Sequence, residues 1–247
     1  MRMGRLIILT GPSCAGKSPL KRCVARLHPE IYHRLSHVVL YNSRTPRPGE
    51  VDGKDYHFRE RAEIEGCRGR QGFIVMDVRG DLQALDVNGL LPQLEAGDVL
   101  YEGNPVVAHE MLTNETLKEM PSVGIYLSPL SGEEMRFVHQ TEGVDPRRFV
   151  TDVSRRKLLR RTRRQKGELS LKDLEEVERR AGAAYDELKL AVHFEHVLVN
   201  HDGEDSDNWN AFYFPVGEAR RALLDFVAIL VGDGEGCGEQ WRTGDWS

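Results

Sequence analysis

The sequence has little cysteine, no long apolar run and no excess of positive charge. Its four cysteines, Cys14, Cys23, Cys67 and Cys237, are scattered over 247 residues without a CxxC pair. This pattern is typical of reduced thiols in a cytoplasmic compartment and not of a disulfide framework. No apolar run is long enough to span a bilayer. The formal net charge of −5 argues against a general nucleic-acid or membrane-surface binder.

What the sequence does contain is an alternation of apolar strand-like runs with helical segments. The Val-, Ile- and Leu-rich runs are Arg5–Thr10, His37–Tyr41, Asp98–Glu102, Gly124–Ser128 and His196–Asn200. Runs of this kind fit strands buried on both faces of a mostly parallel sheet. Apolar stripes at helical spacing predict helices over Leu171–Leu190 and Val216–Val231. The alternation predicts a three-layer α/β sandwich, and the length indicates one large domain or one domain with a mobile subdomain.

A phosphate-binding motif follows the first apolar run. The segment Gly11-Pro12-Ser13-Cys14-Ala15-Gly16-Lys17-Ser18 matches G-x-x-x-x-G-K-[ST]. The two glycines permit a backbone that turns its N–H groups toward phosphate oxygens. Lys17 supplies a positive charge for the β- and γ-phosphates, and Ser18 a hydroxyl ligand for Mg²⁺. The motif predicts an ATP site that includes Gly11, Ser13, Cys14, Ala15, Gly16, Lys17 and Ser18.

Two residues of this motif carry further expectations. Pro19 follows Ser18 and is tolerated in the first turn of a helix, but it lacks the N–H and the hydroxyl that commonly reach the α-phosphate. We therefore expect weakened nucleotide affinity. Cys14, near a helix N-terminus, is either a redox-sensitive thiol or a small loop residue, and the second interpretation is favoured.

A second motif carries two arginines on a stiff loop. The run Ser43-Arg44-Thr45-Pro46-Arg47-Pro48-Gly49-Glu50, with Tyr56 and Phe58 downstream, contains an Arg pair flanking a proline. A rigid Arg pair can chelate a phosphate group, and the Tyr56 hydroxyl can reach the same phosphate. The alternative is a solvated basic loop.

This run resembles the monophosphate-binding signature of guanylate kinases, T-R-x-P-R-x-G-E-x-x-G-x-D-Y-x-F. The resemblance implies a P-loop kinase fold with a parallel-sheet core, an acceptor-binding subdomain and an Arg-bearing lid. It also implies that Arg44, Arg47 and Tyr56 hold the acceptor phosphate.

Weaker resemblance extends to about Asp202. The run Arg160–Arg164, followed by Arg180-x-Ala-x-Ala-x-x-Glu187, resembles the family's lid and suggests Arg164 and Arg180 as catalytic cations beside Lys17 and Arg44. A solvated helix face is the alternative for the Arg160–Arg164 cluster. The final strand resembles the family's in ending on Asn200, which implies a place beside the adenine.

The resemblance also suggests a division of the chain. The kinase-like domain would span residues 1–232, with an acceptor-binding subdomain at about 37–98, an insert at about 136–157 and a lid at about 158–180. Residues 233–247 are rich in glycine, and we expect a disordered tail, which Trp241 and Trp246 could nevertheless dock.

The departures from the family pattern cluster on the acceptor side. Leu40 stands where the family has a Ser, and Val75 where it has a Glu that binds the guanine edge. Gln83 replaces a phosphate-contacting Tyr, and Leu85 a small hydroxyl residue. Near the central strand Glu102 retains an acid, so Gln83 and Glu102 remain as acceptor-site candidates. Asp77 or Asp81 could substitute for the missing Glu.

The function that follows is transfer of the γ-phosphoryl group of ATP to a phosphorylated acceptor, with Mg²⁺ held through Ser18. The acceptor would be GMP or a related nucleoside monophosphate, with a sugar phosphate as a further option. A catalytically weak guanylate-kinase-like binding module is the alternative from another class. We expect no nucleic-acid or membrane partner, and the sequence leaves the oligomeric state open.

Overall fold

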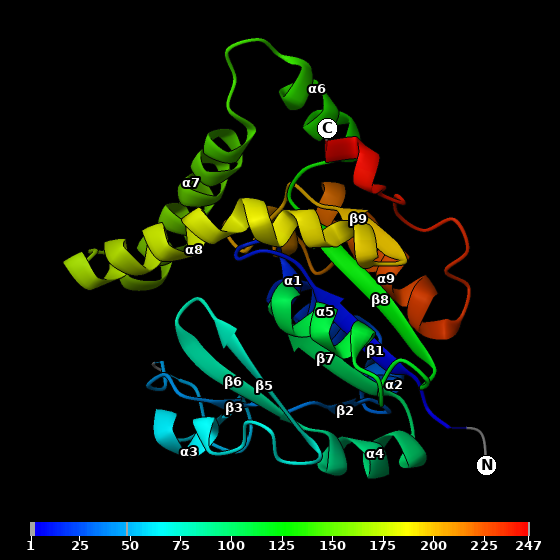
Figure 1. Cartoon of the computed structure of the whole chain (residues 1–247). Helices are drawn as coiled ribbons and strands as arrows, with labels where there is room; N and C mark the ends of the chain where they lie inside the picture. Colours follow the sequence, from blue (N-terminus) through cyan, green and yellow to red (C-terminus); the bar gives the residue numbers. More distant parts are fainter. Residues whose placement is uncertain (1–2, 48, 247) are drawn as a thin grey trace.

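Two sheets and a long helical hairpin make up the fold in the computed structural model, which describes residues 3–47 and 49–246 (Figure 1). Side chains are described up to Gly244 at the C-terminal end. None of the helices in this part of the chain is both long and apolar enough to cross a membrane.

The larger sheet has the strand order β2-β7-β1-β8-β9, and all of its strands are parallel. Its strands are β1 (Leu6–Thr10), β2 (Ser36–His37), β7 (Val99–Gly103), β8 (Ser122–Ser128) and β9 (His196–Val199). Every residue of β1 is buried, which explains its continuous apolar run. The carboxyl ends of β1 and β7 lie side by side, because Thr10 is in register with Gly103.

Helices cover both faces of this sheet. Helices α1 (Lys17–Leu27) and α9 (Gly217–Val231) bury their apolar sides against Ile7 and Leu9 of β1. Leu6 and Ile8 point to the other face, which is covered by α4 (Val87–Ala96), α5 (Pro105–Thr113) and the C-terminal part of α8 (Leu171–Lys189). The predicted three-layer α/β sandwich is confirmed.

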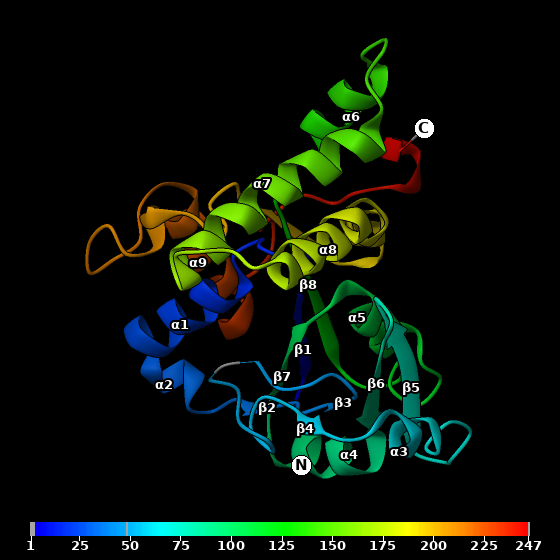
Figure 2. The ribbon, with the colours of Figure 1, turned by 90° about the vertical axis from the view of Figure 1, so that its left-hand side faces the viewer.

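The smaller sheet, with the order β4-β3-β6-β5, spans residues 41–86. It consists of β3 (Tyr41–Asn42), β4 (His57–Phe58), β5 (Phe73–Val78) and β6 (Asp81–Asp86), with α3 (Arg61–Glu65) packed on one side through Ile64. Figure 2 shows it beneath the edge of the central sheet, opposite α7 and α8. It falls within the segment 37–98 that we predicted to bind the acceptor.

The segment His37–Tyr41, expected to be a single strand, is instead divided between the two sheets. Ser36 and His37 pair with β7 in the large sheet, whereas Tyr41 and Asn42 pair with β4 and β6 in the small one. The intervening Leu40 is buried in the core between the sheets. The apolar run therefore contains one core residue among half-buried neighbours, and it could not reveal that the chain changes sheets.

Helices α7 (Pro146–Lys166) and α8 form an antiparallel hairpin that crosses above the carboxyl edge of the large sheet (Figure 1). Asp145 caps the start of α7, and a capping box at Ser170 starts α8. The hairpin rests on the phosphate-binding loop through a cluster formed by Cys14, Leu158, Val177 and Ala181.

The proposed insert at 136–157 is part of this helical region. It comprises the end of α6 (Gly132–Gln140), the connection to α7 and the first half of α7. The helix continues without a break at Lys157, so residue 157 does not mark a structural boundary.

The tail expected to be disordered is instead packed on the core. Glu239 pairs with Val197 of β9, and the indole of Trp241 is buried in the same core cluster as β1. The Glu239 carboxylate also accepts hydrogen bonds from the Trp241 indole and the Gly132 N–H. The expectation missed this docking because the contacts of Glu239 with Val197 and Gly132 span long sequence separations. Ser247 and the Trp246 side chain lie outside what the structure describes.

The short elements not yet named are α2 (Pro29–Tyr32) and the 3₁₀ turns Leu190–His193, Asp207–Trp209 and Thr243–Trp246.

Candidate active site

The phosphate-binding loop connects the carboxyl end of β1 to the start of α1. Gly11 and Gly16 have φ of 147° and 102°, conformations that favour glycine. A Cβ on Gly11 would lie 2.2 Å from the carbonyl oxygen of Leu127, so the loop also needs glycine for its close approach to β8. The Lys17 ammonium donates hydrogen bonds to the carbonyls of Gly11 (2.7 Å) and Pro12 (2.8 Å). Burial lowers the pKa of Lys17, while the carboxylates of Glu204 and Glu102 act in the opposite direction.

Ser18 and Glu102 bring two oxygen ligands together beside this loop. The Ser18 hydroxyl donates a 2.9 Å hydrogen bond to Glu102, whose other oxygen pairs with Lys21 at 2.5 Å. Burial raises the pKa of Glu102, but Lys21, Lys17 and the Ser18 hydrogen bond outweigh burial and lower it overall. Glu102 is therefore a carboxylate at neutral pH. A hydroxyl and a carboxylate at the start of α1 fit the preference of Mg²⁺ for oxygen ligands.

The predicted acceptor clamp lies opposite the loop. The Glu50 carboxylate accepts hydrogen bonds from both terminal nitrogens of Arg44, at 2.6 and 2.7 Å. These bonds hold the guanidinium over the rings of Tyr56 and Phe58. Arg47 pairs with Glu176 of α8 at 2.9 Å. Burial and the neighbouring Arg44 lower the pKa of Arg47. Burial also raises the pKa of Tyr56, so its hydroxyl stays protonated and can donate a hydrogen bond.

The helical hairpin contributes further arginines. The Nε of Arg180 donates to the Ser13 hydroxyl at 3.0 Å, which joins α8 to the phosphate-binding loop. Burial, together with Arg161, Arg47 and Arg79, lowers the pKa of Arg180 to about 9. The Nε of Arg161 is buried and has no hydrogen-bond partner among the described residues. Cations that crowd together in this way favour a bound anion.

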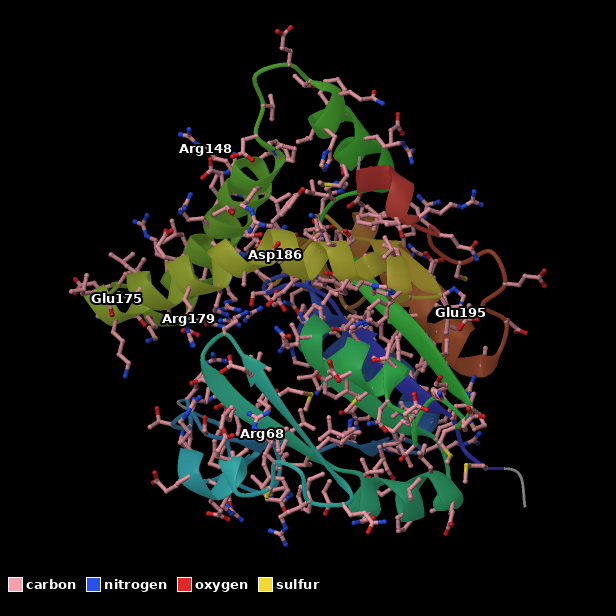
Figure 3. The ribbon with its side chains drawn as sticks, in the orientation of Figure 1. Arg68, Arg148, Glu175, Arg179, Asp186 and Glu195 are labelled. Carbon is pink, nitrogen blue, oxygen red and sulfur yellow. The ribbon has the colours of Figure 1, made fainter. Side chains whose placement is uncertain are left out.

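These groups line one cavity of about 250 Å³. Its cationic side chains are Lys17, Arg44, Arg47, Arg79, Arg161, Arg179 and Arg180, and its carboxylates are Asp81, Glu102, Glu176 and Glu204. Figure 3 shows Arg179 on the side of α8 that faces the β5–β6 hairpin, where it donates to the Arg79 carbonyl (2.5 Å) and to Asp81 (3.2 Å). The P-loop, the Arg pair and the lid arginines thus surround a common space.

Comparison with known proteins identifies the family. The guanylate kinase family model matches residues 3–78. The guanylate kinase of Nocardia farcinica is 50% identical over 138 residues, which cover 54% of this chain and 67% of that protein. That of a Nostoc species is 31% identical over 172 residues, or 69% of this chain and 78% of that protein. The chain belongs to the guanylate kinase family.

The solved structures agree at the level of the fold. A crystal structure of guanylate kinase from Anaplasma phagocytophilum superposes with a TM-score of 0.55 at 18% identity, covering 98% of this chain and 89% of that one. As a guanylate kinase family member, the chain is a phosphotransferase of the nucleoside monophosphate kinase type that uses ATP and Mg²⁺. The relatives support neither a sugar-phosphate acceptor nor the binding-module alternative.

Most of the residues predicted for this kinase's site do line the cavity. They are Gly11, Ser13, Cys14, Lys17, Ser18, Arg44, Arg47, Tyr56, Gln83, Glu102 and Arg180. Cys14 is buried, and burial with Glu204 nearby raises its pKa to about 12, which favours the small loop residue over the reactive thiol. Asn200 lies behind the loop and donates hydrogen bonds to the carbonyls of Ala15 (2.8 Å) and Asp202 (2.6 Å).

Arg164, predicted as a lid cation, is not part of this cavity lining. It is about half exposed and pairs with Asp207 at 3.1 Å. Arg161 of the same cluster lines the cavity instead. Because residues three apart on a helix differ in direction by about 60°, sequence spacing alone could not select between them.

The strand register also corrects the interpretation of Val75. Val75 is opposite Ala84, and both pack toward Ile64 of α3. The neighbouring pair Met76 and Gln83 points to the other face, where Gln83 lines the cavity. Since neighbouring residues of a strand face opposite sides, Val75 is not the residue that replaces a guanine-binding Glu in the site.

The sequence analysis gave no role to Arg79 and did not pair it with Glu187. Both Nε and Nη2 of Arg79 donate to the Glu187 carboxylate, at 2.7 and 2.6 Å, and Asn104 donates to the same group at 2.8 Å. Glu187 is buried on α8, whereas Arg79 is at the tip of the β5–β6 hairpin with φ of 57°. The signal available in the sequence was Glu187 itself, because a buried carboxylate requires a partner.

Proposed function

We propose that this chain transfers the γ-phosphoryl group of ATP to the phosphate of GMP or a closely related nucleoside monophosphate. The relatives from Nocardia farcinica and Nostoc carry the name guanylate kinase. The observation that carries the proposal is the shared cavity of about 250 Å³, which is lined by Lys17 and Ser18 as well as by Arg44 and Arg47. A donor phosphate and an acceptor phosphate bound to these two pairs would lie next to each other.

On the donor side, the P-loop N–H groups and Lys17 bind and neutralise the β- and γ-phosphates. Ser18 and Glu102 would hold Mg²⁺, which supplies charge neutralisation at the phosphates when it is bound. This assigns Glu102 to the metal rather than to the acceptor, because its carboxylate contacts Ser18 and Lys21. Asn200 supports the loop from behind through the Ala15 carbonyl.

On the acceptor side, Arg44, Arg47 and Tyr56 would hold the acceptor phosphate. Glu50 keeps the Arg44 guanidinium in place, so little side-chain entropy remains to be lost on binding. The polar candidates for contact with a base are Asp81, Gln83 and Asn104 of the cavity lining, of which Asp81 also pairs with Arg179 and Asn104 with Glu187. Asp77, the other proposed substitute for Glu, is mostly exposed, and its Oδ1 accepts from the Gly80 N–H.

Leu40 and Leu85, which stand where the family has hydroxyl-bearing residues, are buried in the core between the two sheets and supply no polar group to a base. A site that pairs few polar groups with the base discriminates weakly between bases, because a wrong base leaves little unpaired. We therefore expect GMP turnover with relaxed selectivity against other purine monophosphates.

The lid arginines complete the charge balance. Arg161 and Arg180 lie beside the P-loop. They would neutralise the charge on the phosphoryl group while that group passes between the donor and acceptor oxygens. Helices α7 and α8 close over the cavity and exclude water from the phosphoryl group.

A coupled assay of ADP formation with a panel of acceptors tests this function. The panel contains GMP, dGMP, AMP, UMP and ribose 5-phosphate, each with MgATP and with an acceptor-free reaction as the control. We expect turnover with GMP and dGMP, slower turnover with AMP, and none above the control with ribose 5-phosphate. Absence of turnover with every nucleotide would refute the proposal.

A further inference from the structure

An acidic segment, residues 202–207, follows β9 and lies against the phosphate-binding loop. Its sequence is Asp202-Gly203-Glu204-Asp205-Ser206-Asp207. The Glu204 carboxylate accepts a 3.0 Å hydrogen bond from the Gly16 N–H and lines the same cavity as Lys17. The Gly16 N–H belongs to the backbone that receives the donor phosphates in a P-loop. Glu204 thus presents an anion at a position that a phosphate oxygen would take.

The same segment pairs with cations of the lid. Asp205 is buried and pairs with Lys157 at 3.4 Å and Arg160 at 3.8 Å. Asp207 pairs with Arg164 at 3.1 Å. The segment therefore bridges the P-loop and α7, since its carboxylates bind a backbone N–H of the loop and three cations of the helix.

This arrangement is closely packed. A Cβ on Gly203 would lie 2.0 Å from the carbonyl oxygen of Cys14, so the segment touches the loop backbone where only glycine fits. Trp209 is buried directly after the segment, and its indole N–H donates to the carbonyls of Asp202 (2.7 Å) and Gly203 (3.0 Å). The Asp202 carboxylate accepts from Asn208 and from the Ala219 N–H. Both ends of the segment are anchored, whereas Glu204 is held by its contact with the loop.

We propose that Glu204 is an internal competitor of the donor nucleotide. Its carboxylate has to leave the Gly16 N–H before the triphosphate binds, and electrostatic repulsion between Glu204 and the phosphates opposes binding until it does. The apparent ATP affinity is then reduced by the fraction of molecules in which the carboxylate is bound to the loop. The proposal rests on the proposed function, since it assumes that the donor phosphates bind at the P-loop.

The test compares MgATP binding by wild type, Glu204→Ala and the matched control Glu235→Ala, by isothermal titration calorimetry. Glu235 is exposed and follows α9, whose last turn contacts Arg5 at the end of β1 away from the loop, and its substitution removes the same charge. We expect Glu204→Ala to bind MgATP at least about fivefold more tightly than wild type, the lower end of typical coupling between two sites. Glu235→Ala should match wild type. Unchanged or weaker binding by Glu204→Ala would overturn the proposal.

Hydrogen exchange on the wild-type protein gives a second test that does not depend on the folding of a variant. Saturating MgATP should speed exchange in residues 204–206, between the anchored ends, because Glu204 loses the loop contact that holds this stretch. Unchanged or slower exchange there contradicts displacement. If wild type binds no MgATP at all, the proposed function itself fails; if it binds but Glu204→Ala gains nothing, only the competitor role fails.

Discussion

The hydroxyl of Ser18 donates a 2.9 Å hydrogen bond to Oε1 of Glu102, which joins the start of α1 to the carboxyl end of the neighbouring strand β7. The parallel pairing of β1 with β7 places these two oxygens at one edge of the sheet. We infer that they hold Mg²⁺ together, and this gives the first prediction.

Glu102→Gln should weaken Mg²⁺ binding, because the amide retains the size of the side chain but loses its charge. We expect about 10- to 100-fold lower activity at limiting Mg²⁺, with partial recovery at high Mg²⁺. The measurement is the rate of ADP formation against Mg²⁺ concentration. Glu110→Gln, an exposed position on α5, serves as the control. An unchanged Mg²⁺ curve for Glu102→Gln would return Glu102 to the acceptor side.

The lid offers a matched pair of arginines on one helix. Arg161 lines the cavity with a buried Nε that has no hydrogen-bond partner in the described part of the chain, whereas Arg164 pairs with Asp207 outside the cavity. Arg161→Ala should lower kcat by at least about 100-fold, the effect of removing one donor that stabilises transition-state charge. Arg164→Ala should change kcat less than about threefold, as an exposed ion pair contributes little. Equal effects of the two substitutions would contradict the assignment.

The buried pair Arg79–Glu187 joins the β5–β6 hairpin to α8. Removal of one partner leaves a buried charge uncompensated, and breaking such pairs costs about 3–5 kcal/mol. Glu187→Ala should therefore lower the free energy of unfolding more than Arg79→Ala does, since Asn104 also loses its acceptor. The double variant should be more stable than the sum of the two single effects implies. Additive effects in urea unfolding would show that the pair does not couple the two elements.

The titration of His201 should make the stability of the fold depend on pH. Burial lowers the pKa of His201, but hydrogen bonds to Glu134 and Glu218, at 2.9 and 2.7 Å, outweigh burial and raise it. A raised folded-state pKa stabilises the fold below the unfolded value of about 6.5, and this contribution is lost as the pH rises through the folded value. The Tm should fall above pH 6.5 in wild type and fall less in His201→Asn. The same pH slope in both proteins would contradict this role.

The sequence could predict those parts of the site that are local in the chain. The P-loop and the Arg44–Tyr56 run are contiguous segments, and their side chains face the cavity as the motifs indicated. Side chains whose direction depends on register or helical phase could not be assigned in this way. Val75 faces α3 because of its pairing with Ala84, and Arg161 rather than Arg164 faces the cavity because of how α7 packs on Cys14. Arg79 and Glu204 reach the site through contacts more than 100 residues apart in sequence, to Glu187 and Gly16.

The most direct test of the account is the conversion of GMP and ATP into GDP and ADP, followed by ³¹P NMR for wild type and Lys17→Ala. The account predicts equal formation of GDP and ADP by wild type, no detectable GDP from Lys17→Ala, and matching circular dichroism spectra for the two proteins. Formation of ADP without GDP, or undiminished GDP formation by Lys17→Ala, would contradict the assignment of phosphoryl transfer to this cavity.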